Sequence, residues 1–477
     1  MSAISEFPRT SPESQGLPSK AIWEFVDAVE QEIHDVHTFM LLRHGNVIAE
    51  GAWSPYGLQR PHMLFSLSKS FTSTAIGLAV HEGRLSTGDT VISFFPESVP
   101  AEISDHLAGL KIHHLLAMCT GHDEDTTPFL HQASDGDWVK AFLAQPLKHE
   151  PGTHFLYNTG ATFVLSAILQ KVTGITLLEY LQPRLLEPLG IRNATWESNP
   201  QGIHVGGWGL AINTEDIARF GQLYLQNGRW HGVQLVPETW VKLATSKHIS
   251  SGSKDDNDWE QGYGYQFWRC RHNAYRGDGA FGQYCIIMPD QDCVLAITGG
   301  LGDMQPPLNL IWKHLLPAMS SSPLPPASPE DQKRLGEKLS SLAYLPPQGN
   351  TTSPMATKVS GKRYQIDPHP VKFERVQFDF SQPECIFRVW NGFGEQTIHC
   401  GSGVWRDGYA ALFEHNPKLV ASGVWRTEDT FEITIRAYET PFVHTMRFHF
   451  EGDQLTMEGV VNVNFGPTEY SLTGHIG

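Results

Sequence analysis

The chain has 477 residues, of which 40% are hydrophobic and 18% are charged, a globular composition with enough length for two or three domains. Its 35 Lys and Arg residues and 51 Asp and Glu residues give a formal net charge of −16, which repels nucleic-acid phosphates and anionic lipid. We therefore expect no nucleic-acid partner and no membrane partner. No stretch approaches the roughly 18 apolar residues of a membrane span, and residues 1–16 lack the basic and apolar segments of a secretory signal. A cytoplasmic location is the expectation that follows.

The cysteines and histidines form no recognisable metal or disulfide pattern. Six cysteines are scattered without a CxxC pair, which favours reduced, mostly buried thiols. They are Cys119, Cys270, Cys285, Cys293, Cys385 and Cys400. The 23 histidines include no HExxH motif, so His34, His37, His113 and His114 are expected on helix surfaces or in the core.

The predicted elements begin with a helix around residues 21–32 and a hairpin over 38–53 that turns at a His-Gly-Asn tripeptide. From residue 66 to about 206 the apolar spacing is mostly helical. Strand character returns at 281–300, and a helix that opens with proline follows. This order predicts one sheet completed by both ends of the segment, with helices inserted between its strands.

The chain is predicted to divide into two domains and a connecting segment. Residues 1–319 form the first domain, with the helical insertion at about 68–206. Residues 320–349 read as a linker rich in Pro and Ser with a short helix. Residues 350–477 read as an accessory β-rich domain, an antiparallel small barrel or sandwich.

A tetrapeptide repeat stands inside the predicted β domain. Gly-Val-Trp-Arg occurs at 403–406 and again at 423–426. Two copies are too few for a repeat architecture. We predict that they mark equivalent strands, with Trp405 and Trp425 in a core.

Ser66-Leu67-Ser68-Lys69 places a lysine three residues after a serine, at the start of an apolar, helix-like run. Residues i and i+3 share a helix face, so the Lys69 amine is expected beside the Ser66 hydroxyl. Burial lowers a lysine pKa, and a neutral amine can take the proton of a nucleophilic serine. The alternative is an N-cap serine followed by an ordinary lysine, because the spacing alone is common.

Tyr157 is a second candidate, in the polar turn "PGTHFLYNTG" that precedes an amphipathic helix. A phenol in such a turn can shuttle protons if a nearby cation holds it towards phenolate. The alternative is a tyrosine whose ring packs on the next helix.

Three stretches together resemble the serine β-lactamase and penicillin-binding-protein superfamily. They are "FSLSKSFTSTAIGLAVHEGRLSTGDTV", "IHHLLAMCTGH" and "GTHFLYNTGATFVLSAILQKVTG", and the resemblance covers about residues 10–320. It points to the class C-like serine hydrolases, among them esterases, D-aminopeptidases and 6-aminohexanoate-dimer hydrolases. It implies an α/β (α+β) domain, an antiparallel sheet flanked by helices, with an all-helical insertion and the site between two lobes. By this resemblance Ser66 would be the acyl-accepting nucleophile, and Lys69 and Tyr157 the pair that activates it and protonates the leaving group.

Two departures from the family pattern matter. Thr159 stands where the family has the asparagine of Tyr-x-Asn, and it offers one hydroxyl in place of an amide. No Lys-Thr-Gly or His-Thr-Gly follows, and the equivalent stretch is Gly277-Asp278-Gly279. The resemblance then places the oxyanion hole at the backbone N–H groups of Ser66 and Ala280, with Gly279 as the second candidate. A tight turn is the alternative interpretation of Gly-Asp-Gly.

Asp278 carries the inference about substrates. In relatives that recognise β-lactams, this position or its neighbour supplies a cation or hydroxyl for the substrate carboxylate, which Asp278 would repel. We expect poor β-lactam turnover and a preference for neutral or amine-bearing substrates, with Arg276 able to offset the charge. His62 could line the mouth of the site. His122 and Asp123 could border it, with a helix C-cap role as the alternative.

The leading interpretation is a serine hydrolase that cleaves a small ester or amide through an acyl-serine intermediate, without a metal or an organic cofactor. A D-aminopeptidase or amidase is the second interpretation, since such relatives can carry C-terminal β domains. A binding or scaffold module with weak turnover is the third, because the second and third motifs are degraded. The sequence leaves a homo-oligomer open.

Overall fold

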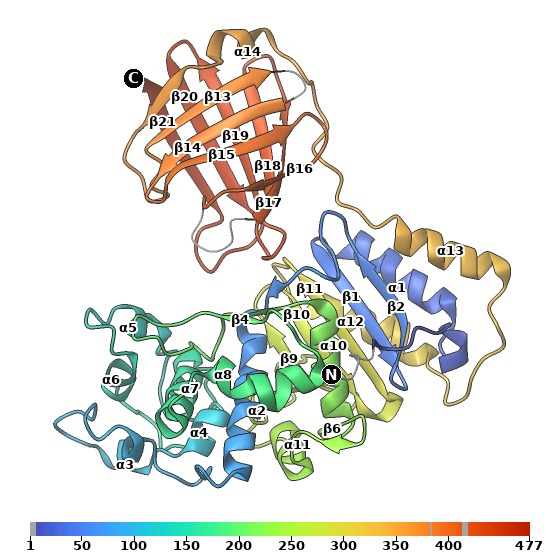
Figure 1. Ribbon diagram of the computed structural model, residues 1–477, viewed down its shortest axis with the longest axis vertical. Coiled ribbons are helices and arrows are strands. Elements are labelled where there is room, and N and C mark those ends of the chain that lie inside the picture. The colour runs from blue at the N-terminus through green and yellow to red at the C-terminus, as the bar shows by residue number, and fades with distance from the viewer. Residues whose placement is uncertain (1–5, 382–383, 413–417) are drawn as a thin grey trace.

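The computed structural model describes residues 6–381, 384–412 and 418–477. Figure 1 shows an α/β region, coloured blue to yellow, and a β-barrel, coloured orange to red, above it. The α/β region holds an antiparallel sheet flanked by helices, as predicted. The predicted C-terminal β domain is confirmed as well, and of the two alternatives it is a barrel.

The sheet of the α/β region has six antiparallel strands in the order β2-β1-β11-β10-β9-β8. Their bounds are β1 (Val36–Arg43), β2 (Asn46–Ala52), β8 (Trp268–Arg269), β9 (Tyr275–Gly279), β10 (Gln283–Met288) and β11 (Cys293–Gly299). Strand β1 pairs with β11, and Phe39 lies opposite Ile297. Both ends of the segment therefore complete one sheet, which confirms the prediction.

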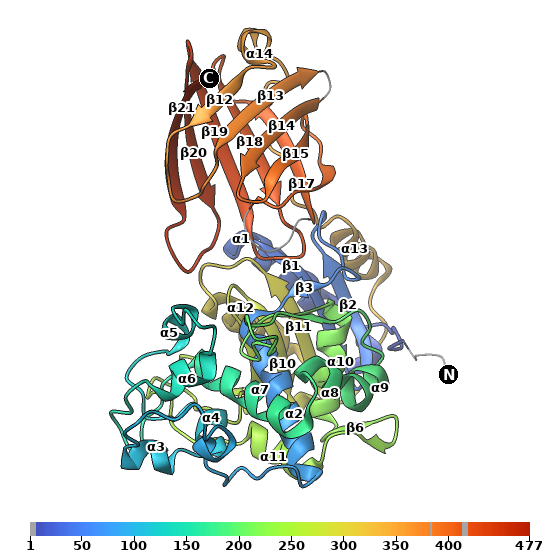
Figure 2. The ribbon, with the colours of Figure 1, turned by 60° about the vertical axis from the view of Figure 1, so that its left-hand side comes forward.

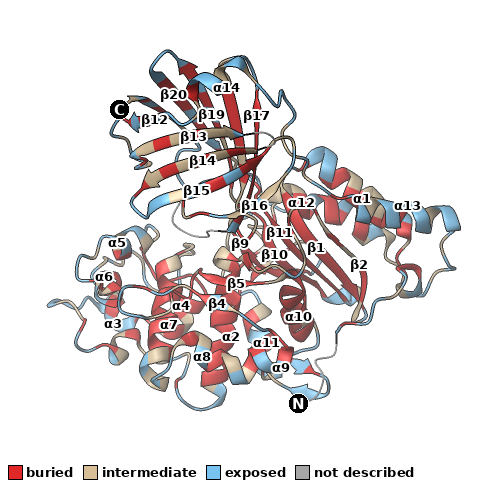
Figure 3. Cartoon of the chain, turned by 45° about the horizontal axis from the view of Figure 1, so that its top comes forward, coloured by how far each residue is buried: buried red, intermediate tan, exposed pale blue. Residues whose placement is uncertain are grey.

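Strand β1 is buried along its whole length because helices cover both faces of the sheet (Figure 3). Phe39 packs on the side of α1 (Ser19–Glu32). Leu42 packs on the opposite side, with α10 (Thr214–Leu225). A strand buried on both faces needs apolar side chains at successive positions, which explains why this hairpin strand lacks polar alternation.

Most of the regular elements between β2 and β8 are helices. The helices before α10 are α2 (Ser68–His81), α3 (Asp105–Gly109), α4 (Ile112–Leu116), α5 (Thr127–His131), α6 (Trp138–Leu143), α7 (Thr159–Thr173), α8 (Leu177–Leu181) and α9 (Glu187–Leu189), and α11 (Glu238–Thr245) follows it. Short strands accompany them: β3 (His62–Met63), β4 (Thr195–Trp196), β5 (Leu210–Ile212), β6 (Arg229–Trp230) and β7 (Val233–Gln234). Within the described residues no single helix could cross a membrane, although one bent pair, Thr159–Thr173 with Leu177–Leu189, passes on length and composition alone.

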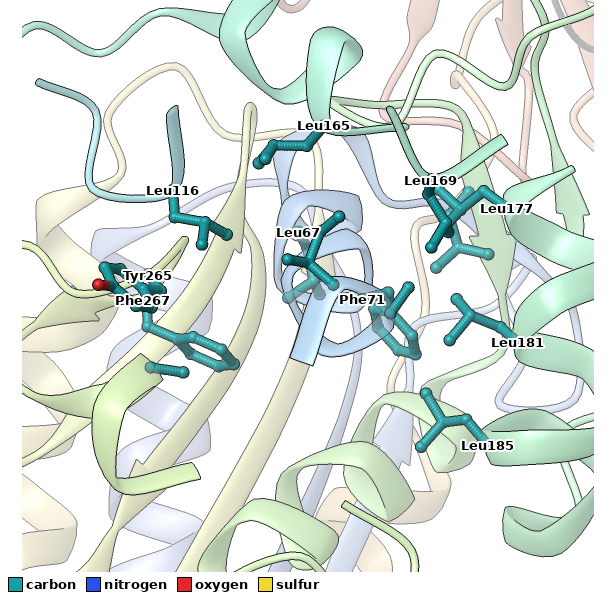
Figure 4. Close-up of a cluster of buried hydrophobic side chains, with 14 of the residues drawn as sticks. Leu67, Phe71, Leu116, Leu165, Leu169, Leu177, Leu181, Leu185, Tyr265 and Phe267 are labelled. Atoms are coloured by element: carbon teal, nitrogen blue, oxygen red, sulfur yellow. The ribbon is translucent and has the colours of Figure 1, made fainter. Parts of the chain in front are cut away.

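Helix α2 runs through the middle of this region and is buried on nearly every side. Figure 4 shows Leu67 and Phe71 pointing into an apolar cluster that includes Leu116, Leu169 and Leu181 from surrounding segments. Close-packed neighbours leave little room for movement. The first turn of α2 is therefore a fixed platform; it carries Lys69, and Ser66 lies in the turn directly before it.

The barrel is one ten-stranded sheet that closes where its edge strand β15 pairs with β17, the neighbour of the other edge strand, β16. Its strands are β12 (Arg363–Ile366), β13 (Arg375–Ser381), β14 (Glu384–Asn391), β15 (Gly394–Gly401), β16 (Arg406–Tyr409), β17 (Lys418–Trp425), β18 (Thr430–Arg436), β19 (Val443–Glu451), β20 (Gln454–Val461) and β21 (Glu469–Ile476). The alternate side chains of these strands that point inwards, such as Phe378 and Phe448, fill the interior. Helix α14 (Pro354–Val359) precedes the first strand.

The Gly-Val-Trp-Arg repeat does not mark equivalent strands. Residues 423–425 lie in β17, whereas 403–405 lie in the loop that leads into β16. Trp425 is 1% exposed within the barrel core, as predicted. Trp405 is only half-buried and donates its indole N–H to the Tyr344 carbonyl at 2.8 Å. The prediction of a second core tryptophan is wrong, because this indole joins the barrel to the segment before it.

The segment between sheet and barrel is anchored to the α/β region. Helix α12 (Gln305–Leu310) follows the last sheet strand, and α13 (Pro329–Ser340) lies within the predicted linker. The Arg334 guanidinium of α13 sits 3.5 Å from the centre of the Trp23 ring on α1. The linker thus contains a helix that packs on the sheet-covering helix.

Loops at one end of the barrel contact the α/β region (Figure 2). In the β18–β19 loop, the Glu439 carbonyl accepts a hydrogen bond from the Met63 N–H at 2.8 Å. In the β20–β21 loop, the Asn462 side-chain amide donates to the Gly300 carbonyl at 3.0 Å. Because Met63 is three residues before Ser66, these contacts bring the barrel to the neighbourhood of that serine.

Candidate active site

Ser66 lies in a 3₁₀ turn, Phe65–Leu67, that continues directly into α2. The Lys69 Nζ donates a hydrogen bond to the Ser66 Oγ at 2.9 Å and another to the Gly207 carbonyl at 2.7 Å. Ser66 remains partly exposed, whereas Lys69 is 1% exposed. The pair therefore joins an accessible hydroxyl to a buried amine.

The buried position of Lys69 changes its protonation. Burial lowers the pKa of Lys69 to about 7, because desolvation disfavours the ammonium, while the nearby Asp125 and Asp278 act in the opposite direction. A large fraction of the side chain is then a neutral amine near neutral pH. Such an amine can donate to Gly207 and still hold a lone pair for the Ser66 proton.

Tyr157 closes the other side of Ser66. Its ring centre lies 4.9 Å from the Lys69 Nζ, and Ser66 is near enough to its hydroxyl to affect its pKa. The ring stacks on Trp268 with centroids 5.4 Å apart. Burial raises the pKa of Tyr157, and the charge of Asp278 raises it further. From the sequence we considered a cation that would lower the pKa of Tyr157, whereas the structure raises it. The side chain therefore stays a phenol, which can donate a proton.

Strand β9 passes against the turn that carries Ser66, and its glycines allow that approach. A Cβ on Gly277 would lie 2.5 Å from the Ser70 Oγ. A Cβ on Gly279 would lie 2.0 Å from the Leu64 carbonyl oxygen and 3.1 Å from the Leu67 nitrogen. The backbone of Gly279 is therefore in contact with the backbone on either side of Ser66. Ala280, the next residue, begins the turn to β10.

This close approach makes a prediction for Gly279→Ala. The new methyl must push β9 away from residues 64–67, so we expect the amide of Ala280 to shift relative to Ser66. Misplacing one oxyanion donor costs a factor of roughly 10²–10³ in kcat, which steady-state kinetics with an activated ester would measure. Gly302→Ala is the control, because a Cβ there meets nothing within 4 Å. Equal rates in the two variants would contradict the assignment.

Asp278 is not a free carboxylate. Its Oδ2 accepts a hydrogen bond from the Arg276 Nε at 2.8 Å, and the two residues are 6% and 0% exposed. Arg276 also donates to the Asp258 carbonyl at 2.8 Å. Burial raises the pKa of Asp278, and Arg276 acts against that rise. The charges of the two side chains cancel, as the sequence allowed for Arg276. The pair therefore presents little net charge to a substrate.

Breaking this pair should destabilise the protein more than it changes the chemistry. In Asp278→Asn the guanidinium of Arg276 stays buried without its counter-ion, which typically costs about 3–5 kcal/mol. We therefore expect a lower free energy of unfolding in urea denaturation. Asp123→Asn is the control, since that carboxylate is exposed and its one ion pair among the described residues is with His149. Loss of stability within ~0.5 kcal/mol of the control would show that the buried pair contributes little.

Thr159 and its neighbours complete the rim of the site. A Cβ on Gly207 would lie 2.8 Å from the Thr159 methyl and 3.6 Å from the Lys69 Nζ. The Thr159 N–H donates to the Asp125 Oδ1 at 3.0 Å. Asn158 is buried and its side-chain oxygen instead accepts from Thr126, at 2.8 Å from the hydroxyl. Thr159 thus lies beside Gly207, whose carbonyl accepts a hydrogen bond from Lys69, whereas the Asn158 side chain is engaged by Thr126.

The sequence offered two histidines and one aspartate as residues at the mouth or border of the site. His62 is buried, and its Nε2 is 3.0 Å from the Nδ1 of His37, so it does not line the mouth of the site. His122 is buried with its Nδ1 2.8 Å from the Thr120 hydroxyl. Asp123 is exposed. His122 and Asp123 lie in a loop beyond α4, whose C-cap is Ala117, so neither caps that helix.

Sequence reasoning missed three contributors to the site: Asp125, Gly207 and Trp268. Asp125 has a local signal, since an aspartate before Thr-Thr-Pro is typical of a helix start. Gly207 and Trp268 have no such signal. They lie 138 and 199 positions after Lys69 in the chain (207 − 69 and 268 − 69) and meet the site only through the fold.

Comparison with known proteins gives a consistent family. The β-lactamase family model matches residues 27–300. A 6-aminohexanoate-dimer hydrolase from Paenarthrobacter ureafaciens is 25% identical over 315 residues, which cover 61% of this chain and 80% of that protein. A lovastatin esterase from Penicillium rubens is 25% identical over 248 residues, covering 43% and 59%. A D-aminopeptidase from Brucella anthropi is 26% identical over 169 residues, covering 32% and 31%.

Solved structures share the fold. A Bacillus anthracis protein assigned as a 6-aminohexanoate-dimer hydrolase aligns with a TM-score of 0.54 at 20% identity, covering 65% of this chain and 86% of that one. An octameric penicillin-binding protein homologue from Pyrococcus abyssi aligns with a TM-score of 0.50 at 14% identity, covering 95% and 99%. At such identities the likeness concerns the fold alone.

Proposed function

Because this chain belongs to the β-lactamase family, whose relatives are serine hydrolases, we propose that it cleaves a small ester or amide through an acyl intermediate on Ser66. The observation that carries the proposal is the 2.9 Å hydrogen bond between Ser66 and a buried lysine. Burial makes that lysine a base near neutral pH.

In the acylation step, the Ser66 Oγ attacks the substrate carbonyl carbon while the neutral Lys69 amine takes its proton. The carbonyl oxygen gains negative charge, and in this proposal the backbone N–H groups of Ser66 and Ala280 stabilise it. Gly279 keeps these two segments in contact. The arrangement provides the nucleophile, the base and the oxyanion donors from three adjacent segments.

Collapse of the tetrahedral intermediate expels an alcohol or amine, which must receive a proton. Tyr157, a phenol whose ring centre lies 4.9 Å from the Lys69 Nζ, supplies it and is reprotonated from the ammonium of Lys69. Water then attacks the acyl-serine, with the same pair removing its proton and returning one to Ser66. The cycle leaves the protein unchanged and releases a carboxylic acid.

The proposed substrate is neutral, and turnover of β-lactams is low. Strand β9 carries one cation, Arg276, which is fully buried and paired with Asp278. It is therefore not presented to a substrate carboxylate. The reason differs from the repulsion expected from the sequence, because the paired Asp278 is nearly neutral towards the site.

A substrate panel tests this proposal. The purified chain would be assayed with p-nitrophenyl esters from acetate to octanoate, D-alanyl p-nitroanilide and nitrocefin. We expect kcat/KM for an ester to exceed that for nitrocefin by more than about tenfold, which is ~1.4 kcal/mol of transition-state binding. A higher kcat/KM for nitrocefin than for the esters would contradict the proposal that β-lactamase activity is low. Preference for the anilide would favour a D-aminopeptidase. Self-association and a cytoplasmic location stay predictions.

A further inference from the structure

Four phenylalanine rings meet beside Ser66, two from each part of the molecule. Phe65 directly precedes Ser66, and Phe281 directly follows Ala280; their ring centres are 5.4 Å apart. The barrel contributes Phe442 from the β18–β19 loop and Phe465 from the β20–β21 loop. We call these four residues the aromatic cluster. It lies next to both segments that would hold the oxyanion.

The two barrel rings contact both rings of the α/β region. Phe465 lies 5.9 Å from Phe65 and 4.9 Å from Phe281, measured between ring centres. Phe442 lies 6.3 Å and 6.0 Å from the same two rings. Several of these pairs are edge-to-face, the arrangement that aromatic rings favour. The barrel is thus connected to the nucleophile turn through ring contacts.

The backbone positions of the two inner rings are unusual. Phe65 has φ of +47° and Phe281 has φ of +67°, in the left-handed region that bulky residues rarely adopt. Such conformations cost of order 1–3 kcal/mol each and cluster at functional sites. In both cases the strained residue is adjacent to a residue of the proposed oxyanion hole. The strain is consistent with a need for a ring at each of these two positions.

Phe465 differs from the other three in its exposure. It is 77% exposed, although a ring of this size is normally buried. Its loop is nevertheless held, because the Asn462 side chain donates to the carbonyls of Gly300 and Pro441, each at 3.0 Å. A fixed, exposed apolar ring beside a nucleophile offers surface to a bound apolar group.

We propose that the aromatic cluster forms the binding surface for the acyl group of the substrate, and that Phe465 of the barrel determines the preference for an apolar acyl chain. This inference rests on the proposed function and adds its substrate class: esters or amides of alkyl or aryl carboxylic acids longer than acetate. The cluster carries no charge and so favours no ionic group.

The geometry assigns the cluster to the acyl side. A carbonyl bound at Ser66 has its oxygen at the N–H groups of Ser66 and Ala280. Its leaving group must face Tyr157, which supplies the proton. The acyl chain is the remaining substituent, and the aromatic cluster flanks the oxygen site on the residues before Ser66 and after Ala280.

The test compares Phe465→Ala, Phe465→Trp and Leu345→Ala with the unchanged chain. Leu345 is the control, because it is also 77% exposed and belongs to the segment before the barrel. Each protein would be assayed with p-nitrophenyl acetate, butyrate and octanoate, and with acetate esters of methanol, butanol and octanol. The first series varies the acyl chain, and the second varies the leaving group.

We expect Phe465→Ala to lower kcat/KM for octanoate by about 5–10-fold through a higher KM, with less than a twofold change for acetate. Phe465→Trp should retain the preference, and Leu345→Ala should match the unchanged chain. An equal fall for acetate and octanoate, or an effect confined to the alcohol series, would overturn this inference alone. If the unchanged chain cleaves neither these esters nor the D-alanyl p-nitroanilide, the proposed function itself is overturned.

Discussion

Ser66→Ala is expected to abolish ester turnover, with kcat reduced by roughly 10⁴–10⁶-fold, the range found when a serine nucleophile is removed. The acyl intermediate cannot form without the Oγ, and the Lys69 amine then has no hydroxyl to activate. The same variant should resist covalent labelling by a fluorophosphonate. Intact-protein mass spectrometry checks this directly, because the unchanged chain should gain the mass of one phosphonyl group.

Ser73→Ala is the matched control for the nucleophile. Ser73 lies on α2, the helix that follows Ser66; it is fully buried, and its hydroxyl has no hydrogen-bond partner among the described residues. Removing it should leave both turnover and labelling intact. Full labelling of Ser66→Ala at a different serine would refute the assignment of the nucleophile. Absence of labelling in every form of the protein would favour a binding or scaffold module.

Lys69→Met is expected to lower kcat by about 10²–10⁴-fold, the usual contribution of a general base. Methionine keeps much of the side-chain volume in this buried position but provides no lone pair for the Ser66 proton. Activity should therefore fall while the fold persists, as circular dichroism would show. The exposed Lys242→Met serves as the control.

The pH dependence follows from the same residue. Lys69 acts as a base only when it is neutral, and burial lowers its pKa to about 7. For the unchanged chain, kcat/KM should rise with pH through about 7 and then level off, because the ammonium loses its proton over that range. In Lys69→Met the residual activity should lack this limb. An identical limb in both proteins would show that another group titrates.

Much of the fold could be predicted because the relevant signals are local. The hairpin at 38–53 is marked by apolar runs around a turn tripeptide, and the sequence places strand character again at 281–300. These segments form β1, β2, β10 and β11 of one sheet. The prediction that the two Gly-Val-Trp-Arg copies mark equivalent strands was wrong, because one copy lies in a strand and the other in a loop.

Site residues could be predicted where they lie close together in the sequence or where the resemblance to the family is specific. Ser66 and Lys69 are three residues apart, so helical geometry alone brings them together. Arg276 and Asp278 are two apart on a strand, which puts them on one face and allows the observed pair. Asn158 and Thr159 are neighbours, and the sequence placed the second at the asparagine position of the family motif, which stays a prediction. In the structure Thr159 lies beside Gly207, whose carbonyl accepts a hydrogen bond from Lys69.

By itself, the sequence determined the elements, the serine–lysine pair and the resemblance to a hydrolase superfamily, because periodicity, turn residues and short spacings are properties of neighbouring residues. Only the tertiary structure decided the protonation of Lys69 and Tyr157, since both depend on how completely distant segments remove water from them. It alone brought Phe465 to Phe65 across 400 positions of the chain (465 − 65). Such contacts arise from how the barrel packs on the α/β region, and no local pattern encodes that packing.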